Sequence, residues 1–463
     1  MDKLAAIVLA AGQGKRMKSS LPKVLHPLAG RPLLHYPVRA AFDAGASEVV
    51  VVVGKDADAV RASLAEAFGE TVKTAVQEEP RGTGDAVRCG LPALSDDVDA
   101  TFILYGDTPL VEGDDLRALV GAIGSRPLAL LSCHLDNPTG YGRVVRGEDG
   151  SVLRIREDRD CSPREKAIRE INAGMYLVRT AFLRKALDQL SPDNAQNELY
   201  LTDIVELAAR VSEGSMAVLS DPVRLSGVND RAQLAEAEAH MFRRIRERLG
   251  KKGVTIHGEP LVDDTVVVHE DATLGPGVCL RGKTVVERGA IVDVGCVVTD
   301  SVVGEGAELR PYSVVTESKV GPRAKIGPFA HLRPQSDIGE EAHIGNFVET
   351  KKTVVHARAK ANHLAYLGDG IVGEGSNVGA GTIFCNYDGF NKHQTTLGKN
   401  VFIGSDSQIV APVTIGDGAY VATGTTVTKD VPPNALAIGR VAQENKLGYA
   451  ERLRARLKMK KGK

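Results

Sequence analysis

The sequence predicts two folds in one chain: a Rossmann-like α/β domain followed by an all-β parallel β-helix. Up to about residue 228, apolar strands alternate with helical stretches, whereas beyond Gly253 an aliphatic residue followed by a small residue recurs every six positions. The 463 residues also exceed the roughly 250–300 that one hydrophobic core usually serves. We therefore expect an α/β domain over residues 1–228, a linker helix over 229–250 and an all-β domain over 251–463.

The N-terminal strands are predicted at residues 5–9, 48–53 and 101–105, each of which is an apolar run. Amphipathic segments lie between them, and this alternation indicates βαβ units and a mainly parallel sheet. The charged segment that follows has periodic apolar positions that include Met241 and Ile245, which is typical of a helix.

The six-residue repeat of the C-terminal half is typical of a parallel β-helix. Pairs such as Ile338-Gly339 and Ile344-Gly345 mark one flat side per hexad, and three hexads close one coil. We expect on the order of ten coils, whereas a β-sandwich would show period two. The repeat is interrupted at residues 349–367 and 384–396, and the side chains there favour a site over tolerated loops: they include Glu349, Lys351, Lys352, His363, Tyr366, Asn386, Tyr387, Lys392 and His393.

Composition excludes several classes of protein. The 58 lysines and arginines nearly cancel the 59 aspartates and glutamates, so no global field would attract nucleic acid or a membrane surface. The six cysteines form no CxxC pair, which argues against a zinc site or a disulfide scaffold and favours the cytoplasm. The apolar run at residues 4–11 is too short for a signal peptide.

A glycine-containing loop, Gly12-Gln13-Gly14-Lys15-Arg16, follows the first predicted strand. Backbone N–H groups in such a loop can bind phosphates. The loop is not a Walker A motif, because Arg16 stands where Ser or Thr should bind magnesium. It is not a dinucleotide fingerprint either, because its third glycine is missing. In isolation, a plain tight turn remains an equal alternative.

Three further motifs change that balance: Leu21-Pro22-Lys23-Val24-Leu25, Gly82-Thr83-Gly84-Asp85-Ala86 and Tyr105-Gly106-Asp107. With the glycine loop, they resemble the sugar-nucleotidyltransferases. The resemblance implies that Arg16 and Lys23 bind phosphates and that Asp107 and Asn229 are ligands of Mg²⁺. The structural alternatives are a solvated lysine for Lys23 and a helix N-cap for Asp107.

The same resemblance implies a wider site for UTP and the sugar. Gln77 matches the glutamine that contacts uracil, and Glu79-Pro80-Arg81 departs from relatives that often have a second base-contacting glutamine there. The remaining positions implied in nucleotide and sugar binding are Leu9, Ala10, Ala11, Gly12, Gly14, Gly82, Thr83, Tyr105, Gly106, Gly142, Glu157 and Asn172.

Considered whole, the chain resembles the bacterial bifunctional N-acetylglucosamine-1-phosphate uridyltransferases/glucosamine-1-phosphate acetyltransferases, except over its last twenty or so residues. That family implies a left-handed coil, a homotrimer, Mg²⁺, and acetyl-CoA and UTP as co-substrates. His363, within the family's catalytic segment, is implied as the general base, and Glu349 as the carboxylate that orients it. We interpret the basic residues 452–463 as a solvated charge run.

The resemblance assigns two more sets of residues in the β-helix. Those implied in binding the sugar phosphate are Arg333, Lys351, Tyr366, Asn377 and Lys392. Those implied in binding acetyl-CoA are Ala380, Asn386, Tyr387, Ser405, Thr423 and Arg440, where Thr423 replaces a frequent alanine. Two alternatives stay open: a nucleotidyltransferase whose β-helix only oligomerises, and a β-helix that serves as a non-enzymatic scaffold.

Overall fold

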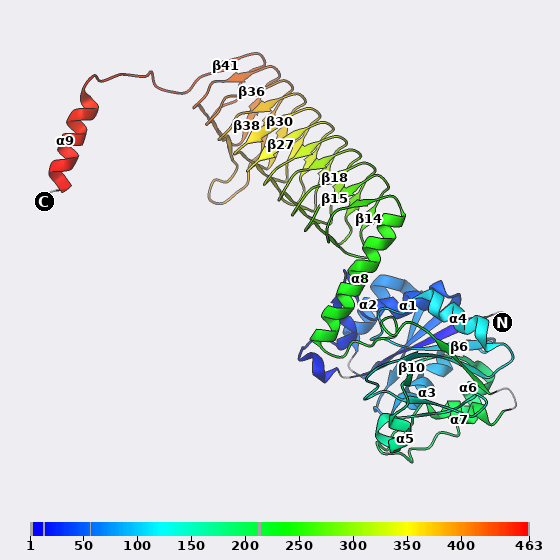
Figure 1. Cartoon of the computed structure of the whole chain (residues 1–463). Helices are drawn as coiled ribbons and strands as arrows, with labels where there is room; N and C mark the ends of the chain where they lie inside the picture. The colour runs from blue at the N-terminus through cyan, green and yellow to red at the C-terminus, as the bar shows by residue number, and fades with distance from the viewer. Residues whose placement is uncertain (1–2, 13, 56, 212–213, 462–463) are drawn as a thin grey trace. The chain divides into compact units, whose positions relative to one another are not determined.

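The computed structural model describes residues 3–12, 14–55, 57–211 and 214–461. The chain divides into two compact units, Met1–Ile245 and Arg246–Lys463. The first contains a central sheet with helices packed on it, and the second contains a coil of short strands (Figure 1). The predicted α/β and β-helix classes are both confirmed.

The first unit is built on a nine-stranded sheet of order β5-β4-β1-β6-β10-β7-β11-β9-β8. Its strands are β1 (Leu4–Ala10), β4 (Ala46–Gly54), β5 (Val72–Gln77), β6 (Ala100–Tyr105), β7 (Leu128–His134), β8 (Arg143–Arg146), β9 (Val152–Arg156), β10 (Glu170–Arg179) and β11 (Ser215–Leu219). The three predicted strands correspond to β1, β4 and β6. These strands and β5 are parallel, but β10 runs antiparallel to both β6 and β7. The sheet is therefore mixed rather than mainly parallel.

Helices cover both faces of this sheet. They are α1 (His35–Asp43), α2 (Asp58–Phe68), α3 (Thr83–Gly90), α4 (Gly113–Ile123), α5 (Pro163–Lys166), α6 (Thr180–Leu187) and α7 (Asp203–Ala209). Ala6 and Val8 of β1 belong to the core that includes residues of α1, α2 and α4, whereas Ile7 belongs to the core that includes residues of α3, α6 and α7. Burial on both faces explains why β1 is a continuous apolar run.

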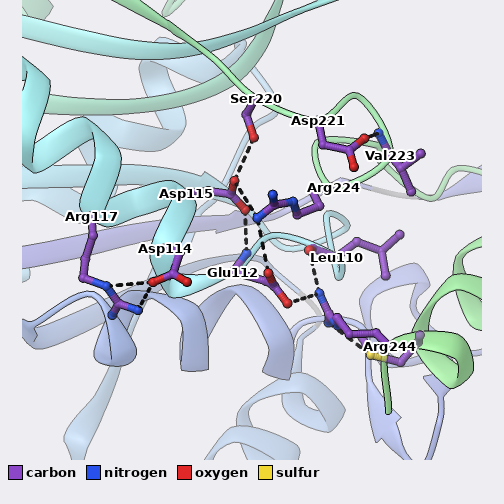
Figure 2. A network of polar contacts seen from close by, with 11 residues as sticks. Leu110, Glu112, Asp114, Asp115, Arg117, Ser220, Asp221, Val223, Arg224 and Arg244 are labelled. Carbon is purple, nitrogen blue, oxygen red and sulfur yellow. Dashed lines mark hydrogen bonds and ion pairs between the residues drawn. The ribbon is translucent and has the colours of Figure 1, made fainter. Parts of the chain in front are cut away.

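A network of ion pairs joins α4 to α8 (Arg231–Lys251) inside the first unit (Figure 2). Arg244 of α8 lies 2.9 Å from Glu112, whose side chain caps α4 in a capping box with Asp115. Arg224 lies 3.3 Å from each of these two carboxylates. The network therefore holds α8 at Arg244 against the start of α4.

The second unit is a parallel β-helix with three sheets of 11, 10 and 9 strands. The sheets begin at β12 (Thr255–Ile256), β13 (Leu261–Val262) and β14 (Val267–Val268). The period of six is explained by the inward residue of each short strand: Ile326, Leu332 and Ile338, six apart and one from each sheet, are fully buried. The left hand of the coil stays a prediction.

The prediction that the repeat is interrupted at residues 349–367 is wrong. This stretch forms regular strands: β28 (Glu349–Lys351), β29 (Val354–Val355), β30 (Lys360–His363) and β31 (Tyr366–Gly368). Polar residues occupy outward positions there without changing the coil. The second interruption is a loop between β34 (Ile383–Cys385) and β35 (Thr395–Leu397), and it stands out from the coil in Figure 1.

The predicted basic tail lies largely in α9 (Tyr449–Lys461), whose side chains are all exposed. Residues 462 and 463 of that prediction lie outside the described residues.

Candidate active sites

Three predicted site residues meet in the first unit, although they are far apart in the sequence. The Lys23 ammonium donates a hydrogen bond to the Asp107 carboxylate and lies 3.3 Å from the Asn229 side-chain oxygen. Asp107 follows β6, and its carbonyl accepts a hydrogen bond of 2.8 Å from the Val228 N–H, which holds the residue before Asn229 in place. A cation and two oxygen ligands thus converge beyond the carboxyl ends of parallel strands, where α/β sheets bind ligands.

The backbone at Gly14 packs against Lys23 in a conformation that requires glycine. Gly14 has φ 58°, and a Cβ added there would lie 2.5 Å from the Cβ of Lys23. Gly106 holds the ends of β6 and β1 together, because its N–H donates to the Leu9 carbonyl at 2.9 Å. Arg16 is exposed in the short helix that follows Gly14, where it is free to meet a phosphate. The residue between Gly12 and Gly14 lies outside the described residues.

The positions implied in sugar binding also meet in the first unit. The Asn172 N–H donates to the Gly142 carbonyl at 2.8 Å, and the Asn172 amide donates to the Tyr176 hydroxyl at 2.6 Å. Glu157 accepts a hydrogen bond of 3.1 Å from the Thr202 hydroxyl, and burial raises the pKa of the Glu157 carboxyl. Tyr176 and Thr202 were missed in the sequence, because neither stands in a motif that signals its role.

Tyr105 lies at the end of β6 and packs against Gly174. A Cβ added to Gly174 would lie 2.4 Å from the Tyr105 ring, so the absence of a side chain at Gly174 leaves room for that ring. The Thr83 hydroxyl accepts a hydrogen bond of 3.1 Å from the Leu201 N–H, which ties the start of α3 to the segment that precedes Thr202. Gln77 lies nearby in sequence at the end of β5 and is 6% exposed.

In the β-helix, five polar or small residues form a column on successive coils, which we call the His363 column: Asn346, His363, Ala380, Ser405 and Thr423. Asn346 and His363 are paired in register, and the pairing of the strands that precede the other three places them in line. His363 Nδ1 lies 2.9 Å from Asn346 Oδ1. The column therefore unites the predicted base with three residues implied in acetyl-CoA binding.

A second group lies on the neighbouring sheet. Glu349 and Tyr366 are paired in register, and Arg333 lies 2.7 Å from the Glu349 carboxylate, an ion pair that raises the pKa of the guanidinium. Lys351 is on the same strand as Glu349. In the described part of the chain no hydrogen bond joins Glu349 to His363, because β28 and β30 belong to different sheets. Asn346, missed in the sequence, occupies the place expected of Glu349.

The remaining predicted residues lie around these two groups. Asn377 begins β33 (Asn377–Val378), and Arg440 donates to the Thr423 carbonyl. In the protruding loop, the Lys392 ammonium lies 4.5 Å from the Tyr387 ring centroid, and buried Asn386 donates to the Asp369 carboxylate.

The oxygen donors Asp107 and Asn229 fit a magnesium ion, because hard cations prefer carboxylate and amide oxygens and an ammonium already lies between them. Within the described ranges there is no group of three or more His, Cys, Asp or Glu residues that could hold a metal. The helices described include none long and apolar enough to cross a bilayer.

Comparison with known proteins agrees with both folds. Residues 6–203 match the MobA-like NTP transferase domain, and residues 394–429 match the bacterial transferase hexapeptide (six repeats). The chain is 59% identical to the bifunctional protein GlmU of Sorangium cellulosum, over 98% of each chain. It is 49% identical to that of an Anaeromyxobacter species and 46% identical to that of Trichlorobacter lovleyi, over 98% and 96% of this chain and 93% and 97% of those proteins. The chain therefore belongs to the family of bifunctional GlmU proteins, and it contains a nucleotidyltransferase domain and transferase hexapeptide repeats.

Proposed function

We propose that the second unit acetylates glucosamine-1-phosphate with acetyl-CoA, and that the first unit transfers UMP from UTP to the resulting N-acetylglucosamine-1-phosphate with release of pyrophosphate. The observation that carries the proposal is that each unit assembles its own set of reactive side chains. Lys23, Asp107 and Asn229 meet in one unit, and the His363 column forms in the other.

In uridyl transfer, a phosphate oxygen of the sugar phosphate attacks the α-phosphorus of UTP, and the bond to the β-phosphate breaks. Lys23 and Arg16 neutralise phosphate charge, and Glu157 and Asn172 hold the sugar. Magnesium bound by Asp107 and Asn229 would add charge neutralisation at the triphosphate. Since no covalent enzyme intermediate is needed, positioning and charge supply the catalysis.

In acetyl transfer, the amine nitrogen attacks the thioester carbonyl, and the coenzyme A thiolate leaves. We assign His363 as the general base that accepts the amine proton. With its proton on Nδ1, His363 donates to Asn346 Oδ1 at 2.9 Å, which leaves Nε2 free as the acceptor. Arg333, Lys351 and Tyr366 supply cations and a hydroxyl for the sugar phosphate, and Lys392 and Asn377 are proposed for the same substrate. The residues proposed on the acetyl-CoA side are Ala380, Asn386, Tyr387, Ser405, Thr423 and Arg440.

Replacing Asn346 with alanine should lower acetyl transfer about tenfold, through kcat more than KM, because one hydrogen bond that orients the base is lost. Asn346→Asp keeps an acceptor for Nδ1 and should restore most of the rate. If Asn346→Ala acetylates at the wild-type rate, Asn346 does not position His363.

We also propose that the protein is a homotrimer joined along its β-helices. An exposed ladder of aromatic rings, Tyr312, Phe329 and Phe347, runs along one corner of the coil, with centroids 5.4 and 5.5 Å apart. Phe347 follows Asn346 directly, so the ladder borders the His363 column. Stacked apolar side chains that remain exposed in one chain are typical of a subunit contact.

Light scattering of the wild type should therefore give three chain masses. Phe329→Asp combined with Phe347→Asp should yield a monomer that loses acetyl transfer and keeps uridyl transfer, because the first unit contains its own site. A wild-type monomer with full acetyl transfer activity would contradict the trimer.

Two assays test the proposed function separately. Thiol release from acetyl-CoA with glucosamine-1-phosphate reports the second unit, and pyrophosphate release from UTP with N-acetylglucosamine-1-phosphate and Mg²⁺ reports the first. We expect both. Pyrophosphate release without thiol release would favour a nucleotidyltransferase whose β-helix only oligomerises.

A further inference from the structure

The side-chain amide of Gln77 is held by two oxygen atoms from the start of α3. Its Nε2 donates to the Gly82 carbonyl at 3.1 Å and to Asp85 Oδ2 at 2.9 Å. Gln77 ends β5 and is almost fully buried, so water does not replace these partners. Both hydrogen atoms of the amino group are therefore engaged within the protein.

These contacts fix which way the amide faces. A carbonyl and a carboxylate only accept hydrogen bonds, so a flipped amide would place Oε1 against two oxygens and leave both without a donor. The observed orientation is the one that satisfies all three groups. In this orientation Nε2 faces the two oxygens, and Oε1 is the atom of the amide that points away from them.

The backbone that carries the two oxygens is itself closely packed. Gly82 has φ 111°, and a Cβ there would lie 2.6 Å from the Leu199 carbonyl. The start of α3 is held to the same segment, because the Gly84 N–H donates a hydrogen bond of 2.8 Å to the Leu199 carbonyl. Asp85 lies in the first turn of α3, so the backbone that carries its carboxylate is held in place by the helix.

The neighbouring segment offers no second amide for the base. Glu79 and Arg81 form an ion pair with each other at 2.7 Å, and both side chains are about two-thirds exposed. The position where relatives often have a base-contacting glutamine is thus occupied by a solvent-exposed pair.

We propose that Asp85 is a positioning residue for nucleotide specificity: it holds Gln77 so that only the Oε1 acceptor faces the base, and this selects uracil over cytosine. Uracil presents a donor, N3–H, at the middle of its pairing edge, whereas cytosine presents an unprotonated N3 acceptor there. Oε1 accepts from the former and is repelled by the latter. A site built around one hydrogen bond rejects an analogue that cannot make it. The inference rests on the proposed uridyl transfer.

The test is the ratio of kcat/KM for UTP to that for CTP, measured by pyrophosphate release with N-acetylglucosamine-1-phosphate. Asp85→Ala should lower this ratio at least about tenfold, because only the Gly82 carbonyl then opposes an orientation in which the Gln77 amino group faces the base. Asp85→Asn keeps an acceptor oxygen and should retain most of the preference. Gln77→Ala removes the acceptor itself and should lower the ratio at least as much as Asp85→Ala.

Asp58→Ala is the matched control, because Asp58 also lies in the first turn of a helix but is almost fully exposed and pairs with the nearby Arg61. It should leave the ratio unchanged. A ratio within twofold of wild type in Asp85→Ala or in Gln77→Ala would overturn the inference, as would a wild type that prefers CTP. Failure of the wild type to release pyrophosphate from either nucleotide would instead refute the proposed function. Pyrophosphate release from UTP or CTP by a variant shows in each case that its first unit is folded.

Discussion

Asp107→Ala is expected to lower uridyl transfer by about three orders of magnitude or more, while acetyl transfer stays at the wild-type level. The substitution removes one of the two oxygen ligands proposed for magnesium and the carboxylate that holds the Lys23 ammonium. Interactions of this kind each supply several kcal/mol at a phosphoryl-transfer site, and about 1.4 kcal/mol corresponds to a factor of ten. Pyrophosphate and thiol release from the same preparation measure both activities.

Asp97→Ala is the matched control, because Asp97 lies before the opposite end of β6 and its side chain is 72% exposed. It should preserve both activities. Uridyl transfer that survives in Asp107→Ala would remove Asp107 from the site. Loss of both activities would indicate misfolding, and Asp107→Asn, which keeps an oxygen and the shape of the side chain, would then decide.

His363→Ala should reduce acetyl transfer by about two to four orders of magnitude, which is the usual contribution of a general base. Uridyl transfer from preformed N-acetylglucosamine-1-phosphate should be almost unchanged, because the residues proposed for it all lie in the first unit. An acetyl-enzyme is not needed, since the amine can attack the thioester directly once its proton is taken.

His269→Ala controls for the loss of an exposed imidazole from the coil, because His269 lies in an early coil, 3.6 Å from Glu287 and far along the chain from the His363 column. It should acetylate normally. Wild-type acetylation by His363→Ala would show that another group, or the solvent, accepts the proton.

The sequence predicts the fold classes well because each rests on a repeated physical pattern. One inward aliphatic residue per hexad is enough to define the coil, as buried Ile326, Leu332 and Ile338 show. Strand direction has no such signal: most residues of β10 are buried, as in the parallel strand β1, and only its pairing with β6 and β7 shows that it is antiparallel.

The sequence predicts some site residues and misses others, because only some of them stand in a recognisable motif. Lys23 and Asp107 stand in motifs, whereas Asn346 and Tyr176 make hydrogen bonds that form only after other segments pack against them. Asp85 stands in a motif, but the sequence does not show that its carboxylate meets Gln77. The expectation that Glu349 orients His363 depended on resemblance alone. Within one chain the two residues lie on different sheets, where Glu349 is paired with Tyr366 and His363 with Asn346.

The central claim is that one chain carries out two consecutive reactions in two separate units. Its most direct test is mass analysis of the products after the purified protein is incubated with glucosamine-1-phosphate, isotopically labelled acetyl-CoA, UTP and Mg²⁺. We predict UDP-N-acetylglucosamine that carries the labelled acetyl group, together with free coenzyme A. Labelled N-acetylglucosamine-1-phosphate without the UDP-sugar, or unmodified glucosamine-1-phosphate with acetyl-CoA intact, would contradict the account.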